Sequence, residues 1–253
     1  MNIVVPIKQV PDLVEELEID SSGKDLNREW LKYKVNEFDD HALEEALLFK
    51  EANGGSVTAI VLDSDDIDKV LHAAAAKGAD RVVKITGDFG TSVSSHKAGK
   101  AFAEAIRSMN CDVVMTGVQA VDDRDGQLAG ILAGHLGIPN VNVVTGVSKE
   151  GDQLVIHKEY GGGVVGEFEV STPVVLGIQA AQETPRYIPV AKIRKASRGV
   201  NIEEVSAPTD GRAGSEVVKM YKPVSGQGAE MIGDNADAAA SRIIEILTEK
   251  GIK

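Results

Sequence analysis

The feature that most constrains the fold is a regular alternation in the N-terminal half of the 253-residue chain. Short runs rich in Val and Ile alternate there with segments of helical period, up to Pro139. Such apolar runs are typical of parallel strands that are covered on both faces. The sequence predicts these strands at 2–7, 56–62, 81–85 and 112–116. This part of the chain is therefore expected to be α/β, a Rossmann-like parallel sheet with crossover helices.

Four helices are predicted between and after these strands, at 37–52, 65–77, 97–107 and 127–136. The third has the clearest pattern, because its apolar residues recur at i, i+3, i+4, i+7 and i+8 and form one stripe. The second helix is expected to begin after Ser64 as its N-cap and to end at Gly78. The fourth is expected to stop at Gly137 and Pro139.

After Pro139 the sequence changes to β segments separated by glycine. Runs at 154–160 and 164–170 flank three consecutive glycines, which predicts a β-hairpin, and a buried strand is expected at 174–178. Gly161, Gly163 and Gly166 also match the Gly-x-Gly-x-x-Gly pattern of dinucleotide-binding loops. That pattern requires a strand before it and a helix after it, whereas here a strand follows, so the hairpin is favoured.

The chain beyond Gln182 is predicted to be a polar, irregular tail, because prolines are scattered through it and such turn residues do not suit a packed layer. It ends in a predicted helix at 235–250 whose Ala, Ile and Leu residues form an apolar stripe. This stripe has no obvious partner nearby in the sequence. We expect it to pack on the far side of the domain or on another chain.

Charge and composition exclude several classes of function. The formal net charge of −12 has the wrong sign for a protein that neutralises the phosphates of a nucleic acid, so a nucleic-acid partner is not expected. The single cysteine, Cys111, cannot form an internal disulfide, a Cys-based cluster or a Cys-based zinc site. No run approaches the ~20 apolar residues that span a bilayer. The P-loop and nucleophile-elbow motifs are also missing from the sequence, so we expect no catalytic nucleophile. We further expect a cytoplasmic protein without membrane insertion or bound metal.

The most informative segment runs from Gly117 to Gln127, between a predicted strand and a predicted helix. Open α/β sheets bind ligands where the carboxyl end of a parallel strand meets a helix N-terminus. Backbone N–H groups there favour an anionic phosphate, and Gly126 would allow its close approach. The alternative interpretation is that Asp122, Asp123 and Asp125 only cap the helix and complement its dipole.

Five segments, taken together, resemble the β subunit of electron transfer flavoproteins. They are residues 5–12 (Val-Pro-Ile-Lys-Gln-Val-Pro-Asp), 36–39 with 42–46, 78–81, the loop Gly117-x-Gln119-Ala120-x-Asp122, and Pro185-Arg186-Tyr187. They occur in the order of that family and span roughly residues 1–200. The resemblance implies an adenine-nucleotide-binding α/β fold, like that of the adenine nucleotide alpha hydrolases. It also implies a heterodimer with a larger alpha subunit that carries most of the FAD site.

The resemblance further implies where the β subunit binds AMP or, in bifurcating members, a second FAD. The matching positions are Pro6, Lys8, Asn36, Phe38, Asp39, Leu62, Gly117, Gln119, Ala120, Val121, Asp122, Asp125, Gly126, Gln127 and Leu128. A recognition loop at about 184–195, with Tyr187, Val190 and Lys195, would dock acyl-CoA or other dehydrogenases, and Val190 would be its apolar anchor. The expected division is thus a nucleotide-binding domain at 1–183, followed by the recognition loop and an arm at 184–253 that wraps the alpha subunit.

Two departures from the family pattern leave the ligand open. Glu37 stands where the family usually has proline, and Leu128-Ala129 stands where it has Thr-Gly or Val-Gly beside the phosphates. AMP is slightly favoured over FAD of the bifurcating or nitrogen-fixation-associated type. Two other functions compete with that of an electron transfer flavoprotein subunit: a stand-alone adenine-nucleotide sensor, and a Rossmann-type oxidoreductase. The second lacks a glycine fingerprint after the first strand, where Lys8-Gln9-Val10-Pro11 stands instead.

Overall fold

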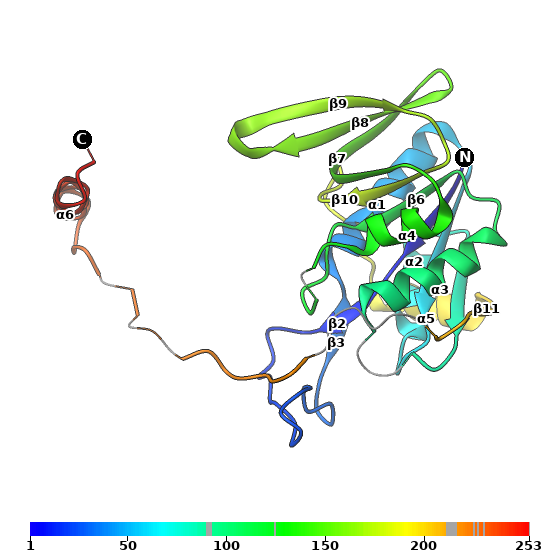
Figure 1. Cartoon of the computed structure of the whole chain (residues 1–253), viewed down its shortest axis with the longest axis horizontal. Helices are drawn as coiled ribbons and strands as arrows, with labels where there is room; N and C mark the ends of the chain where they lie inside the picture. The colour runs from blue at the N-terminus through cyan, green and yellow to red at the C-terminus, as the bar shows by residue number, and fades with distance from the viewer. Residues whose placement is uncertain are drawn as a thin grey trace.

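The computed structural model describes residues 1–89, 93–123, 125–210, 217–224, 226, 228–229 and 231–252. Within these residues the main feature is a nine-stranded sheet with the order β11-β5-β4-β1-β6-β10-β7-β8-β9 (Figure 1). Its strands are β1 (Asn2–Pro6), β4 (Ser56–Leu62), β5 (Arg81–Thr86), β6 (Val113–Gly117), β7 (Asn140–Glu150), β8 (Gln153–Tyr160), β9 (Val164–Val170), β10 (Val174–Ile178) and β11 (Glu203–Ser206). Pairing is parallel from β11 to β7 and antiparallel from β7 to β9. The predicted α/β fold is confirmed.

The order of the strands reverses on the two sides of β1. Helix α1 (Glu37–Asn53) connects β1 to β4, and α2 (Asp68–Lys77) connects β4 to β5. Helix α3 (Ser95–Arg107) then brings the chain back to β6, on the other side of β1. The carboxyl ends of β1 and β6 therefore form the topological switch point, where open α/β sheets leave a crevice for a ligand.

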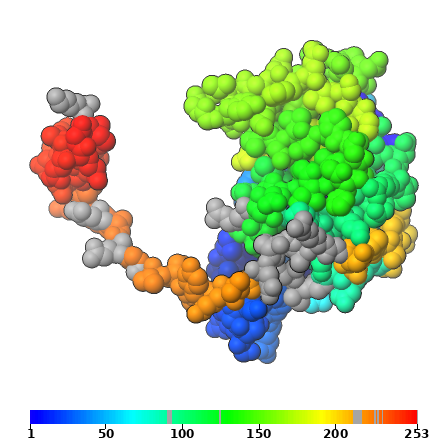
Figure 2. Space-filling model, viewed as in Figure 1, coloured from blue at the N-terminus to red at the C-terminus, as the bar shows by residue number. Residues whose placement is uncertain are grey.

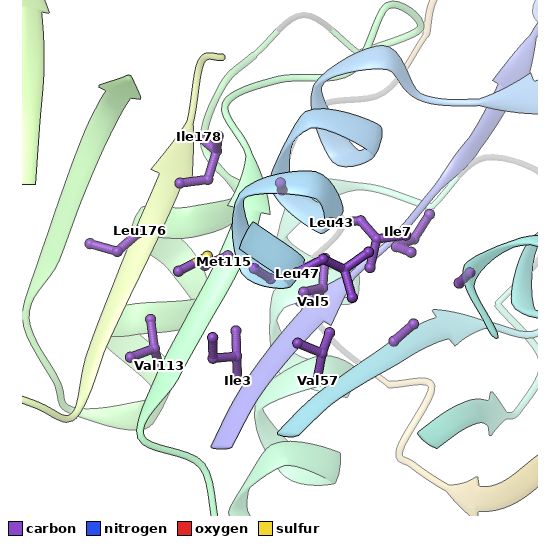
Figure 3. Close-up of a cluster of buried hydrophobic side chains, with 14 of the residues drawn as sticks. Ile3, Val5, Ile7, Leu43, Leu47, Val57, Val113, Met115, Leu176 and Ile178 are labelled. Carbon is purple, nitrogen blue, oxygen red and sulfur yellow. The ribbon is translucent and has the colours of Figure 1, made fainter. Parts of the chain in front are cut away.

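The core consists of two apolar layers, one on each face of the sheet. On one face, α1 and α2 pack against β1, β4, β6 and β10, and Figure 3 shows Leu43 of α1 next to Ile7 and Leu47 of α1 next to Val5 of β1. On the other face, α3 and α4 (Leu128–Leu136) cover Val4, whose side chain points the opposite way. Because both faces are covered, the central strands are almost continuously apolar, which is the pattern seen in the sequence.

The antiparallel part of the sheet extends away from the body as a β-hairpin (Figure 1). Strands β8 and β9 pair from Leu154 with Val170 to Tyr160 with Val164, and a short 3-10 turn, Gly161–Gly163, joins them. Gly162 and Gly163 both have positive φ angles, which glycine adopts without strain. The predicted hairpin is confirmed, and the glycines do not form a dinucleotide-binding loop.

Two predictions about local structure are wrong. The segment after Gln182 was expected to be irregular, yet it contains α5 (Val190–Gly199) and β11, which extends the sheet beside β5. Helix α5 has no buried residue and β11 is an edge strand with two glutamates, so neither has the apolar pattern of a packed element. Ser64 does not cap α2, whose N-cap position is Ile67. Instead the Ser64 hydroxyl accepts a hydrogen bond from the Gln9 amide at 3.2 Å.

Residues 8–36 leave the sheet at the end of β1 and return at the start of α1. They form a small two-stranded sheet of β2 (Gln9–Pro11) and β3 (Tyr33–Val35) and an excursion between them. The excursion contacts the C-terminal arm, because the Met220 N–H donates to the Gly23 carbonyl at 2.7 Å. A hollow of about 410 Å³ lies between the two segments.

The chain ends in helix α6 (Ala236–Glu249), which lies apart from the body (Figures 1 and 2). The Asn235 side chain caps it by accepting from the Ala238 N–H at 3.0 Å. None of its residues is buried, and Ile244 on its apolar stripe is 63% exposed. The expected stripe is present and has no partner within the described part of this chain. Among the described residues no helix is long and apolar enough to cross a membrane.

Candidate functional site

The predicted binding residues lie at the carboxyl edge of the sheet, around the switch point. Pro6 and Lys8 stand at the end of β1, Leu62 ends β4, Gly117 ends β6, Asn36, Phe38 and Asp39 begin α1, and Gln119, Ala120, Val121, Asp122, Asp125, Gly126, Gln127 and Leu128 span the loop from β6 into α4. Residue 124 of this loop lies outside the described residues. Direct contacts join β1, the start of α1 and this loop.

Asp39 connects the two strands at the switch point. One carboxylate oxygen accepts the Lys8 N–H at 2.8 Å, and the other accepts the Gly117 N–H at 3.0 Å. Its side chain is buried, and burial raises the pKa of Asp39 to about 7 although these N–H groups favour the charged form. Asp39 thus holds the ends of β1 and β6 in register with the first turn of α1. In the described contacts Asp39 binds backbone N–H groups of the protein itself and so fixes the positions of the neighbouring residues.

Gly117 is required by this close approach. A Cβ atom at this position would lie 2.3 Å from Asp39 Oδ1 and 2.8 Å from the Asp39 backbone nitrogen. Any larger side chain would therefore push α1 away from the end of β6. The glycine in the predicted binding loop is explained by helix packing, without a ligand.

Asn36 fixes the loop to the start of α1. Its side chain is 2% exposed, and its amide donates to the Gln119 carbonyl at 2.9 Å. Its backbone N–H donates to the Lys8 carbonyl at 2.9 Å. A single residue before the helix thus holds both the strand end of β1 and the loop after β6.

Lys8 forms the ionic contact across the site. Its ammonium group lies 2.7 Å from an oxygen of Asp122 and 3.1 Å from one of Asp123. Burial alone would lower the pKa of Lys8, but the two carboxylates outweigh this effect and raise it, so the group stays charged. The interpretation of these aspartates as helix caps is wrong for Asp122 and Asp123, which pair with Lys8.

Asp125 has a different partner. Its carboxylate accepts from the hydroxyl of buried Ser95, at the start of α3, and from the Gln127 N–H at 3.0 Å. Gly126 has a φ angle of 61°, a left-handed conformation that favours glycine. The entry to α4 is therefore anchored on α3.

Several groups at this edge can bind an anionic ligand. The N-terminal turn of α4, behind Gly126, is the kind of place where backbone N–H groups bind a phosphate. Lys8 contributes a cation, while Phe38 and Leu62 contribute half-buried apolar side chains at the same edge. Among the described residues no group of three His, Cys, Asp or Glu side chains could hold a metal ion. A second hollow, of about 160 Å³ and lined by Cys111 and Leu136 among others, lies away from this edge.

The three predicted docking residues lie on one exposed segment that contains none of the predicted nucleotide-binding residues. Tyr187 is 84% exposed and Val190, the first residue of α5, is 60% exposed. Lys195 is exposed on the same helix. The segment does not form a loop throughout, since its second half is helical.

Sequence reasoning missed the residues that hold this segment in place. Glu44 and Glu45 of α1 are 3% and 0% exposed, and both accept hydrogen bonds from residues 182–186. The only available signal was two glutamates within the apolar period of α1, between Leu43 and Ala46. Glutamate is rarely buried without a partner, and the partner is distant in the sequence.

The chain is similar to known proteins over its whole length. The family model described as "Electron transfer flavoprotein domain" matches residues 25–210. The electron transfer flavoprotein subunit beta of Methylophilus methylotrophus is 34% identical over 98% of each chain. The subunits of the same name from Clostridium acetobutylicum and Thermoanaerobacterium thermosaccharolyticum are 34% and 32% identical, over 99% and 100% of each chain. The chain therefore belongs to the electron transfer flavoprotein family and is similar over its whole length to the beta subunits.

Proposed function

We propose that this chain is the beta subunit of a heterodimeric electron carrier. With an alpha subunit it would form a FAD-containing dimer that accepts electrons from dehydrogenases and passes them to a quinone oxidoreductase or another acceptor. The observation that carries this proposal is the match to beta subunits over the whole length of the chain. The bound flavin supplies the redox chemistry, and the protein supplies binding and orientation.

The carboxyl edge of the sheet at the switch point is the proposed site of AMP. Three features support this: its place at the carboxyl ends of β1 and β6, the helix N-terminus behind Gly126, and the cation of Lys8. Because Asp122 and Asp123 already pair with Lys8, a phosphate at this cation would have to replace them. In the bifurcating alternative, the same edge would hold a second FAD instead of AMP.

The exposed segment with Tyr187, Val190 and Lys195 is the proposed docking surface for acyl-CoA or other dehydrogenases. Its exposed apolar side chains next to a cationic helix suit a small, transient contact. The C-terminal arm and α6 would pack on the alpha subunit, which would cover the apolar stripe.

A stand-alone nucleotide sensor is the competing function, and the exposed stripe on α6 argues against it. Gel filtration with and without an alpha subunit distinguishes the two, because a sensor would elute unchanged.

The visible absorbance spectrum of the purified heterodimer tests the carrier proposal. One flavin per dimer that is bleached by a dehydrogenase and its substrate is expected for the simple carrier, and two flavins for the bifurcating type. A folded heterodimer without flavin, or with flavin that neither donor nor acceptor affects, would contradict the proposal.

A further inference from the structure

Arg186 is attached to α1 by both its backbone and its side chain. Its N–H donates to Glu44 at 2.9 Å, and its guanidinium donates to the same carboxylate at 2.9 Å and 3.0 Å. A further guanidinium nitrogen donates to Glu51 at 2.7 Å, about two helical turns along α1 from Glu44. Arg186 thus contacts two carboxylates on one helix, a geometry that suits its planar, forked group.

The inner part of this contact is shielded from water. The side chain of Glu44 is 3% exposed, whereas that of Glu51 is 52% exposed. The hydrogen bonds that its guanidinium donates to Glu44 and Glu51 raise the pKa of Arg186, so this group stays charged. An interaction between opposite charges is stronger when it is shielded from solvent. Glu44 is therefore the stronger of the two anchors.

Glu45 provides a second anchor beside the first. Its buried carboxylate accepts from the Gln182 N–H at 2.9 Å and the Gln182 side-chain amide at 2.8 Å, and it also accepts the Val147 N–H at 2.8 Å. Two consecutive residues of α1 thus hold the chain at positions 182 and 186. This fixes the path of the segment that leads to α5.

The exposed docking residues follow directly after this anchored path. Tyr187 is adjacent to Arg186, and Val190 comes three residues later at the start of α5. Helix α5 in turn contacts α2, and the neighbouring Val200 and Ile202 pack on the core. Tyr187 and Val190 are therefore held between two fixed points and point outward.

We propose that Glu44, through Arg186, is the positioning residue of the docking surface formed by Tyr187 and Val190. The role rests on the proposed docking of dehydrogenases at this surface. Glu44 does not touch the partner, because its carboxylate is buried against Arg186. Without the charge of Glu44, Arg186 would lose its buried ion pair and keep the exposed one with Glu51, and the segment would sample several orientations. A partner would then bind more weakly, while electron transfer within the bound complex would be unchanged.

The test uses the full heterodimer with Glu44→Gln as electron acceptor of a dehydrogenase. The expected result is a several-fold increase in KM for the flavoprotein with unchanged kcat and unchanged flavin content. Hydrogen exchange at residues 187–199 is expected to be faster, with the sheet strands unaffected. Arg186→Lys keeps the charge but cannot bridge Glu44 and Glu51. Its KM should therefore lie between those of the wild type and Glu44→Gln. Asp40→Asn is the matched control, because Asp40 is on the same helix and pairs with Lys77 at 2.5 Å instead.

The outcomes separate this proposal from the docking function itself. A normal KM for Glu44→Gln, together with a raised KM for Val190→Ala, would overturn the positioning role alone. A normal KM for both variants would overturn the docking function. If Glu44→Gln fails to assemble, Arg186→Lys decides, since a normal KM with that variant would contradict the proposal. A raised KM for Asp40→Asn would also contradict it, because the effect would then be a general one of α1.

Discussion

Asp39 and Gly117 are in direct contact where β1 and β6 end, and each limits what the other position can hold. We predict that Gly117→Ala destabilises the protein by about 1–3 kcal/mol, because its Cβ would overlap Asp39. Gly134→Ala in α4 is the control, since a Cβ there meets nothing within 4 Å and alanine favours helix by about 1 kcal/mol. Urea unfolding measures both changes. Equal effects of the two variants would contradict the packing argument.

The raised pKa of Asp39 predicts that the free energy of unfolding depends on pH. Its folded pKa is about 7 against 3.8 for the free group, so the folded protein keeps a proton that the unfolded chain has lost. Between these values stability should fall as pH rises, by at most about 4 kcal/mol from this group. Urea unfolding of the wild type and Asp39→Asn at pH 5 and pH 8 checks this. The wild type should lose stability relative to the variant, and a constant difference would show that Asp39 is ionised throughout.

At the residue scale, the sequence indicated the edge of the sheet on which the predicted binding residues lie, but not the contacts between them. The rule that parallel sheets bind ligands at their carboxyl edge was sufficient to locate Gly117, Gln119 and Asp122. The contacts of Asp39 with Gly117, and of Lys8 with Asp122, join residues far apart in the chain. No local pattern carries that information.

At the scale of elements, α6 has an apolar stripe that the body of this chain does not cover. We predict that Ile244→Glu leaves the unfolding midpoint of the isolated chain unchanged and weakens its association with an alpha subunit, because a charge would enter the contact. Ala238→Glu, an exposed position on the side of the helix opposite the stripe, is the control. Association can be measured by titration calorimetry. Equal affinities for both variants would show that the stripe does not bind the alpha subunit.

The sequence predicted those elements in which the spacing of apolar residues follows from which side chains are buried. The strands at the centre of the sheet and α3, with its single stripe, are examples. Helix α5 and strand β11 were missed because they lie at the surface and their polar residues resemble a loop. Their position depends on contacts with α2 and β5, which are set by the tertiary fold.

At the scale of the whole molecule, the body, the projecting β-hairpin and the detached α6 suit a subunit that is completed by a partner (Figures 1 and 2). We propose that its switch point holds an adenine nucleotide within a flavin-containing heterodimer. Acid precipitation of the purified heterodimer, followed by chromatography of the supernatant, measures this directly. We expect one FAD and one AMP per dimer, or two FAD in the bifurcating alternative. A folded, active heterodimer that releases a single FAD and no other nucleotide would contradict it.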